Sequence, residues 1–349
     1  MAVDGQLPSA HHAAFFLVGC TATGKTAVAH AIARESGAWV LSADSMLVYR
    51  GMDVGTAKPT AVEREGVVLR GVDLADTDAP FSAGRWLEEA RAAAREADAA
   101  GKDLIVAGGT GLYVSALLRG IDAPAATAAR RAELEKLLAR EGPETLVAHA
   151  EALSPGSTAT IDAKNPRRLV RLVEILESKS HAEFAESFSH AESAENAESL
   201  DVARPASAPT LQPFEPSNRR TAVLVGLDFP AEELNARIAR RALAMFEGGL
   251  LDEVRALCAR GPGFERSTAG AGIGYAEALA ALRGEISADE AVARTAQRTR
   301  RLAKKQRTWW RHQARVEWVR GPADEADVVR AARDVRDLWR KHGKVPLAI

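Results

Sequence analysis

The sequence lacks the features of several broad protein classes. Its two cysteines, Cys20 and Cys258, are too few for a disulfide framework or a four-cysteine zinc site. No uninterrupted apolar run approaches the roughly 20 residues that a membrane-spanning helix needs. The apolar run at 13–20 is too short for a span and has no Lys or Arg before it, so it is not a signal peptide either. We therefore expect a cytoplasmic protein with no membrane segment.

Net charge is also almost absent, but its distribution is uneven. The chain has 46 Lys and Arg against 47 Asp and Glu, a formal charge of −1. Residues 294–320 nevertheless hold ten Lys or Arg against one acid, whereas residues 177–201 hold seven acids against one Lys. A local basic face favours an anionic partner, although such stretches are often solvated helix surface. Neutrality of the whole chain does not exclude a nucleic acid or a phosphate ligand.

The length and the hydrophobic pattern predict the fold class. With 349 residues, 46% of them hydrophobic, the chain is long enough for about two domains with a sizeable core. Ala-rich stretches at 26–35 and 83–99 predict helices. Buried strands are predicted at 15–18, 39–41, 104–107 and 221–227. Strands that alternate with helices predict an α/β fold with a doubly wound parallel sheet.

The second half of the chain has a different organisation. Residues 125–176 have a helical pattern punctuated by prolines, and 178–220 are rich in Ala, Glu and Ser with few aliphatic residues. We expect a flexible surface insertion at 178–220. A basic helix, a strand at 316–319 and a helix at 323–341 are expected to end the chain. Helical core positions are predicted at Leu234, Ile238, Met245, Leu250, Val254 and Leu257.

The strongest motif matches the phosphate-binding loop G-x-x-x-x-G-K-[ST]. It consists of Gly19, Cys20, Thr21, Ala22, Thr23, Gly24, Lys25 and Thr26. It lies between a predicted strand and a predicted helix, as this motif requires. Backbone N–H groups and the helix N-terminus would face phosphate oxygens, Lys25 would add a point charge, and Thr26 would hold Mg²⁺. The loop predicts a di- or triphosphate ligand without saying which.

Two further segments follow predicted strands, where a doubly wound sheet has its ligand crevice. Asp44 follows the second strand and is a candidate general base or Mg²⁺ holder. Alternatively, Asp44 or Ser45 caps a helix. The glycine-rich segment 108–113 offers the Thr110 hydroxyl, or is simply a tight turn. It has no acid where a nucleotide hydrolase often carries one, which weakens a routine ATPase interpretation.

The basic segment forms two stripes on a predicted helix. Their members are Arg294, Arg298, Arg301 and Lys305 on one face, and Arg300, Lys304, Arg307 and Arg311 on the next. Contact with a pyrophosphate or with a nucleic-acid backbone explains two cationic faces, and a solvated helix surface is the alternative. We expect the tryptophans at 309 and 310 to anchor the core rather than to stack on bases.

Together these motifs resemble the tRNA dimethylallyltransferase family of the bacterial type, also called tRNA isopentenyltransferases. The long segment 42–59, SADSMLVYRGMDVGTAKP, is the most specific match. The other matching segments, in family order, are 19–26, 108–113, 165–171, 248–254, 274–277 and 299–309. The resemblance covers about residues 15–320, interrupted at 178–220. It implies a P-loop NTPase-like core at 13–121 and 221–349, with a helical tRNA-binding insertion domain at 122–177.

The resemblance also implies the reaction and its residues. The family transfers a dimethylallyl group from dimethylallyl diphosphate to N6 of the adenosine adjacent to the anticodon, with Mg²⁺, and releases diphosphate. By position in the matched motif, Asp44 is the general base and Thr110 steadies the site, while 19–26 bind the diphosphate. Arg241 and Arg300 are weaker candidates for pyrophosphate contact.

The resemblance implies a tRNA partner, bound by its anticodon stem-loop, and a monomeric enzyme is expected. The implied tRNA contacts are Asp44, Ser45, Met46, Leu47, Thr110, Arg131, Arg167, Arg168, Leu169, Val170 and Arg171. The chain departs from the family pattern in three places. Leu47 replaces a common Gln, Arg70-Gly71 replaces a common His pair, and the acidic stretch 178–220 replaces a more basic, helical part.

Three alternatives remain open at this point. A small-molecule kinase would use the phosphate loop for ATP, but it leaves the segment 44–59 and the basic helix unexplained. A prenyltransferase acting on free AMP or ADP would share the catalytic core without a large tRNA-binding domain. A non-enzymatic RNA-binding module would make the joint presence of Lys25, Thr26, Asp44 and Thr110 a coincidence.

Overall fold

The computed structural model describes residues 12–120, 128–163, 165–178 and 222–349. The chain forms two compact units, Met1–Gly120 with Phe214–Ile349, and Ile121–Pro213. The insertion expected at 178–220 lies outside the described residues except for residue 178. Each unit is described by itself.

The first unit is built on one sheet, in which the described residues form seven strands. These are β1 (Ala13–Gly19), β2 (Trp39–Ser42), β3 (Leu69–Arg70), β4 (Leu104–Gly108), β5 (Val223–Asp228), β6 (Arg315–Arg320) and β7 (Val345–Pro346). Their order is β3-β2-β4-β1-β5-β6 with parallel pairing throughout, and β7 joins β1 in antiparallel orientation. The predicted strands are confirmed, and β3 and β7 are additional.

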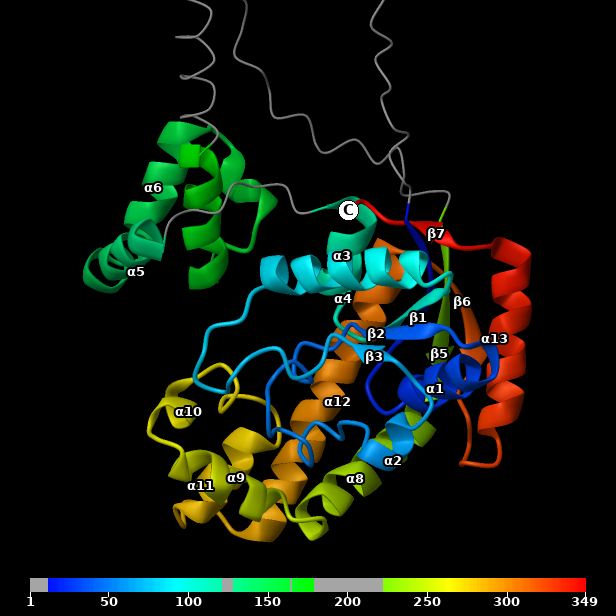
Figure 1. The fold of residues 1–349 in the computed structure, drawn as a ribbon. Helices are drawn as coiled ribbons and strands as arrows, with labels where there is room; N and C mark the ends of the chain where they lie inside the picture. Colours follow the sequence, from blue (N-terminus) through cyan, green and yellow to red (C-terminus); the bar gives the residue numbers. More distant parts are fainter. Residues whose placement is uncertain (1–11, 121–127, 164, 179–221) are drawn as a thin grey trace, which may run out of the picture. The chain divides into compact units, whose positions relative to one another are not determined.

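Helices cover both faces of this sheet. Successive side chains of a strand point to opposite faces, so Phe16 and Val18 of β1 pack on one side and Leu17 on the other. The Leu17 face is covered by α1 (Lys25–Ser36) and α13 (Val328–His342), which lie side by side (Figure 1). The opposite face is covered by α3 (Ala83–Ala99) and α4 (Gly111–Arg119). The predicted doubly wound α/β fold is therefore confirmed.

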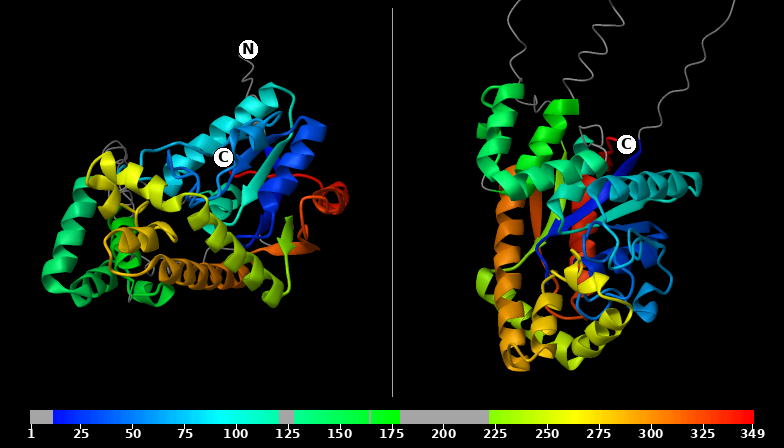
Figure 2. Two further views of the ribbon diagram at one scale, coloured as in Figure 1. Left: turned by 90° about the horizontal axis from the view of Figure 1, so that it is seen from below. Right: turned by 90° about the vertical axis from the view of Figure 1, so that its left-hand side faces the viewer.

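The remaining helices of this unit gather beside the carboxyl ends of the strands. They are α2 (Ala61–Arg64), α8 (Ala231–Glu247), α9 (Leu250–Ala259), α10 (Gly263–Arg266), α11 (Tyr275–Leu282) and α12 (Ala288–Gln313). The basic helix α12 is the longest of them and runs straight past the sheet (Figure 2), packed against α8 and α11. The predicted core positions on α8 and α9 are buried, except Met245, which is partly buried.

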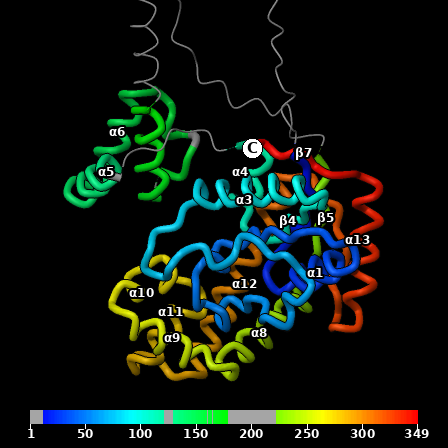
Figure 3. Tube along the Cα trace, in the orientation of Figure 1, coloured from blue at the N-terminus to red at the C-terminus, as the bar shows by residue number. Residues whose placement is uncertain are grey.

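One predicted boundary is wrong. The last helix begins at Val328 and not at residue 323. The preceding residues form turns in which Asp327 accepts the Ala323 N–H and Asp324 accepts the Asp327 N–H. Such side-chain bonds offer the backbone an alternative to the helix. The chain trace of this segment and of α13 can be followed in Figure 3.

The second unit is a small helical bundle with its own core. It contains α5 (Ala128–Glu141), α6 (Pro143–Leu153), a 3₁₀ turn at Ser157–Thr160 and a helix at 166–178. Apolar side chains from these helices, among them Leu134, Leu146 and Val173, are buried together. The predicted helical pattern is thus confirmed for the described part of 125–176. Across the described residues of both units, no helix is long and apolar enough to cross a membrane.

Candidate active site

The phosphate loop connects β1 to α1, and its glycines are required by close packing. Gly19 has φ +139°, and a Cβ there would lie 2.4 Å from the Leu227 carbonyl oxygen. Gly24 has φ +86°, and its Cβ would lie 2.7 Å from Pro322. The buried Thr23 hydroxyl donates to the Cys20 carbonyl at 2.9 Å. Close packing and this hydrogen bond therefore fix the conformation of the loop.

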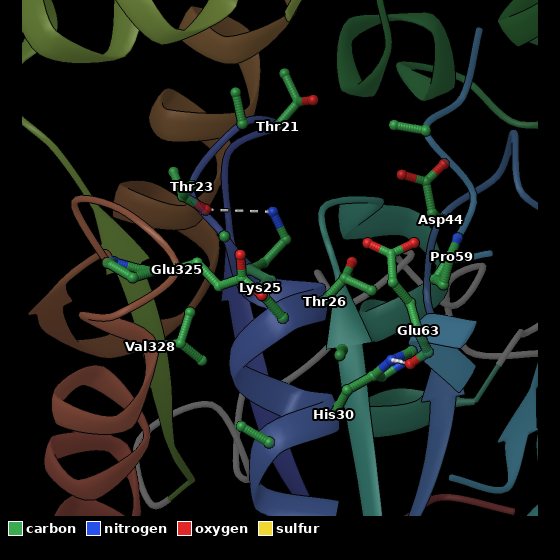
Figure 4. Close-up of a pocket in the computed structure, with 18 of the residues that line it drawn as sticks. Thr21, Thr23, Lys25, Thr26, His30, Asp44, Pro59, Glu63, Glu325 and Val328 are labelled. Atoms are coloured by element: carbon green, nitrogen blue, oxygen red, sulfur yellow. Dashed lines mark hydrogen bonds between the residues drawn. The ribbon is translucent and has the colours of Figure 1, made fainter. Parts of the chain in front are cut away.

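Lys25 has no acidic partner among the described residues. Its Nζ donates to the Cys20 carbonyl and to the Thr23 hydroxyl, the latter at 3.4 Å (Figure 4). Burial lowers the pKa of Lys25 from its usual 10.5 to about 8. A desolvated ammonium that no described carboxylate contacts is suited to receive an anionic ligand.

Thr26 is exposed at the start of α1 and lines a cavity of about 710 Å³. Among the described residues, no cluster of three or more His, Cys, Asp or Glu could hold a metal ion. Magnesium commonly keeps few protein ligands and takes the rest from phosphate oxygens and water. A single hydroxyl beside a phosphate loop fits that arrangement.

Asp44 lies across this cavity from the phosphate loop (Figure 4). Its Oδ1 accepts the Met46 N–H at 2.9 Å, which folds residues 44–46 into a turn. The Thr110 hydroxyl accepts the Ser45 N–H at 3.1 Å, and the Thr110 N–H donates to the Ala43 carbonyl at 3.0 Å. No helix begins at residues 44–46, so the helix-cap alternative is wrong. Thr110 instead holds the turn that presents Asp44.

The glycines of segment 108–113 allow close approach, as expected. A Cβ on Gly108 would lie 2.2 Å from the Ala43 carbonyl oxygen, and one on Gly111 would lie 2.5 Å from the Trp309 ring. Gln306 of α12 bridges this segment to the phosphate loop, because it accepts the Thr21 N–H and donates to the Gly109 carbonyl. The three elements thus meet without room for larger side chains.

A second cavity of about 550 Å³ adjoins the first and is lined by different chemistry. Its wall includes Met46, Ile238, Met245, Leu302 and Trp309, so it is largely apolar. Both cavities are lined by Thr21, Asp44, Thr56 and Arg241. Asp44 and Arg241 therefore lie where the cavity beside the phosphate loop meets an apolar one.

The two predicted pyrophosphate arginines differ in position. Arg241 lines both cavities, donates to the Thr56 carbonyl at 2.8 Å, and has its pKa lowered by burial. Arg300 instead lines a separate groove between α8 and α12, so the structure does not bring it to the phosphate loop. Arg237, four residues before Arg241, lines the first cavity and donates to the Ala22 carbonyl at 3.0 Å. It was missed, although its helical spacing from Arg241 is visible in the sequence.

The basic stripes of α12 are partly neutralised. Arg294, Arg298 and Arg307 pair with Glu290, Glu277 and Asp228 respectively. The remaining basic side chains at 300, 301, 304, 305 and 311 have no ion pair with a described residue. The tryptophan at 310 is fully buried, which confirms its core role, whereas the one at 309 is partly buried and borders the apolar cavity.

The predicted tRNA residues of the second unit divide into two groups. Arg167 and Arg168 are exposed, but the side chains of Leu169 and Val170 are buried in the core of the bundle. Those two apolar side chains anchor the segment and are not available for contact with RNA.

Arg131 and Arg171 of the second unit share one acidic partner. Arg131 makes two bonds to Glu174, at 2.6 and 2.8 Å, and Arg171 makes one at 3.0 Å. Glu174 has a fully buried side chain, and these arginines hold its pKa below the usual value. Both guanidinium groups remain partly exposed, so each retains donors for another anion.

Two departures from the family pattern have structural roles. Leu47 is 7% exposed and lines the first cavity. Arg70 pairs with Glu89 and Glu96 of α3. Gly71 has φ +78°, and a Cβ there would lie 2.7 Å from the Ser42 carbonyl oxygen, so no larger residue fits. Arg70 therefore ties the end of β3 to α3, and Gly71 allows the close approach to the Ser42 carbonyl.

The fold and the site define a class: an α/β protein with a P-loop NTPase-like fold, in which a cavity beside the phosphate loop adjoins an apolar one. A sequence model of the family described as IPP transferase matches residues 47–313. A tRNA dimethylallyltransferase from Anaeromyxobacter sp. (strain Fw109-5) is 42% identical over 90% of this chain and 96% of its own. One from Salinispora arenicola is 38% identical, over 91% and 85%. The crystal structure of a tRNA isopentenylpyrophosphate transferase from Bacillus halodurans is similar with a TM-score of 0.60 and 29% identity, over 94% of this chain and 99% of that one.

The chain belongs to the IPP transferase family. It is therefore a transferase of the prenyltransferase class. The three relatives named above are from bacteria.

Proposed function

We propose that the protein transfers a dimethylallyl group from dimethylallyl diphosphate to N6 of the adenosine adjacent to the anticodon of a tRNA, and releases diphosphate. The observation that carries this proposal is the position of Asp44 and Arg241 at the junction of the two cavities. The phosphate-loop cavity suits the diphosphate, and the apolar cavity suits the prenyl group and the adenine ring. The reacting atoms would then meet beside Asp44.

The diphosphate would be held by the phosphate-loop amides, Lys25 and Arg241. The N-terminus of α1 adds positive potential at the same place. Among the described residues, Lys25 and Arg241 donate hydrogen bonds to carbonyl and hydroxyl oxygens and form no ion pair, so neither cation is neutralised by a carboxylate in contact with it. Thr26 would hold Mg²⁺ together with the diphosphate oxygens, and the metal would supply positive charge to the leaving group. Arg300 is not included, since it lies in a different groove.

Asp44 would act as the general base. The adenine amino group is a weak nucleophile because its lone pair is delocalised into the ring. As its nitrogen forms a bond to the prenyl carbon and the carbon–oxygen bond to diphosphate breaks, Asp44 takes the amino proton. Met46 occupies Oδ1 of Asp44, which leaves Oδ2 to accept that proton. Thr110 keeps the turn in place.

The tRNA would be bound partly by the second unit. Arg167 and Arg168 are exposed, and Arg131 and Arg171 retain free donors beside Glu174. Guanidinium groups arranged this way suit the phosphates of an anticodon stem-loop. The target base must leave its stack to enter the apolar cavity, which costs less in a loop than in a duplex.

The test uses labelled dimethylallyl diphosphate and Mg²⁺ with either unmodified tRNA or AMP. Asp44→Asn keeps an acceptor for the Met46 N–H but removes the base, so kcat should fall by about 10²–10⁴-fold. Asp76→Asn is the matched control, since Asp76 is 71% exposed, pairs with Arg50 and lines neither cavity. Label in one tRNA adenosine, lost only in the Asp44 variant, supports the proposal. Label in AMP alone favours the free-nucleotide enzyme, and ATP turnover without transfer favours the kinase.

A further inference from the structure

A carboxylate outside the matched phosphate-loop and Asp44 motifs holds the backbone next to the site. Glu253, in the first turn of α9, accepts three successive backbone N–H groups. Its Oε2 accepts from Asp53 at 2.9 Å and from Val54 at 2.7 Å, and its Oε1 accepts from Gly55 at 3.2 Å. Successive N–H groups that converge in this way form a concave anion site, and here the anion is part of the protein.

Tyr275 holds the Glu253 carboxylate in place. The hydroxyl of the fully buried Tyr275 donates to its Oε1 at 2.6 Å. Burial raises the pKa of Tyr275, so this hydroxyl stays protonated and remains a donor. The Tyr275 ring also packs on Gly55, where a Cβ would lie 2.5 Å from the ring. The carboxylate thus has one available orientation.

A second anchor of the same segment is Lys58, which also contacts Asp53. The Lys58 side chain is 1% exposed, and its Nζ bonds to the Tyr49 carbonyl, Asp53 and Asp73. Thr56 lies between the two anchors, and its carbonyl accepts from Arg241 at 2.8 Å. This is the hydrogen bond that places the Arg241 guanidinium at the junction of the two cavities. Movement of residues 53–55 would therefore move the acceptor that orients Arg241.

We propose that Glu253 is a positioning residue for diphosphate binding, acting through the 53–55 backbone and the Thr56 carbonyl on Arg241. This inference rests on the proposed function, in which Arg241 contacts the diphosphate. Loss of the carboxylate leaves three amide donors without a full set of acceptors, and the segment relaxes away from α9. Arg241 then loses its fixed place. Binding of tRNA by the second unit does not depend on these contacts.

The experiment measures the Kd for inorganic pyrophosphate with Mg²⁺ by calorimetry on the full chain, together with KM for dimethylallyl diphosphate and for tRNA. Glu253→Gln should raise the pyrophosphate Kd and the diphosphate KM about tenfold and leave the tRNA KM unchanged. Asp252→Asn is the matched control: this neighbour is 81% exposed, pairs with Arg255 on its own helix, and should change nothing. Tyr275→Phe keeps the ring and removes only the hydroxyl, and should raise the same Kd about threefold.

An Arg241→Ala background separates positioning from mere stability. If Glu253 acts through Arg241, Glu253→Gln adds no further loss in that background. The inference would be overturned if Glu253→Gln raised the pyrophosphate Kd by the same factor in the Arg241→Ala background as in the native protein. It would also be overturned if the Glu253→Gln single variant had a lowered melting temperature but an unchanged Kd and KM. If Glu253→Gln does not fold, Tyr275→Phe takes its place. The pyrophosphate Kd of Tyr275→Phe is then compared between the native and the Arg241→Ala backgrounds in the same way. Should Arg241→Ala itself leave the pyrophosphate Kd unchanged, the proposed role of Arg241 fails and this inference fails with it. A loss in Arg241→Ala but none in Glu253→Gln refutes only the inference.

Discussion

The state of Lys25 leads to a prediction about pH. Burial lowers its pKa to about 8, and its hydrogen-bond partners, the Cys20 carbonyl and the Thr23 hydroxyl, carry no compensating charge. Only the protonated amine attracts a diphosphate, so binding weakens as pH rises through the pKa of the free protein. Relative to the protein with Lys25 fully protonated, a pKa of about 8 multiplies the Kd for pyrophosphate by about 1.1 at pH 7 and by about 11 at pH 9. The expected loss of affinity over that interval is therefore about tenfold.

The assay is calorimetric titration with inorganic pyrophosphate at pH 7, 8 and 9, without metal and at constant ionic strength. Pyrophosphate titrates as well, so a matched variant is needed. Lys25→Arg keeps a cation that does not titrate in this range. The ratio of the two Kd values isolates the lysine and should change about tenfold from pH 7 to pH 9. A ratio that stays constant from pH 7 to pH 9 would refute the reasoning that burial lowers the pKa of Lys25.

Two further predictions concern packing and RNA binding. Gly111→Ala places a Cβ against the Trp309 ring and should lower the free energy of unfolding by about 1–3 kcal/mol in chemical denaturation. Gly84→Ala, with no atom nearer than 3.7 Å, should instead stabilise α3 by about 0.5–1 kcal/mol, and equal effects would contradict the packing argument. Arg167→Ala should weaken tRNA binding and reduce the slope of log K against log salt by about 1. Arg140→Ala, on the exposed face of α5 beside Glu141, should leave that slope unchanged, and an unchanged slope in both variants would exclude a phosphate contact by Arg167.

The parts of the fold that sequence could predict are those with short-range causes. The apolar runs of β1, β2, β4 and β5 and the Ala-rich pattern of α1 and α3 act within a few residues, and they appear where expected. The start of α13 was misplaced because Asp324 and Asp327 bond to backbone groups of their own turn. Helical composition does not report that competition.

The candidate site follows the same division. The phosphate loop, Asp44 and Thr110 could be found from motif spacing, because each lies directly after a strand in the chain. That Arg241 faces the phosphate loop while Arg300 does not depends on how α8 and α12 pack, and their positions along the two helices give no sign of it. The buried side chains of Leu169 and Val170 show the same limit, since a matching motif does not say which of its members face solvent.

The sequence by itself determined most of the strands of the sheet, the phosphate loop and the family. Each of these depends on a local pattern of residues and on their spacing along the chain. Only the tertiary structure decided that Glu253 and Tyr275, some 200 residues from the segment they hold, fix the backbone beside the site. It also decided that Asp44 and Arg241 lie where the cavity beside the phosphate loop meets an apolar one. The physical reason is that hydrogen bonding and burial depend on distance in space. The separation of two residues along the chain does not predict whether packing brings them together.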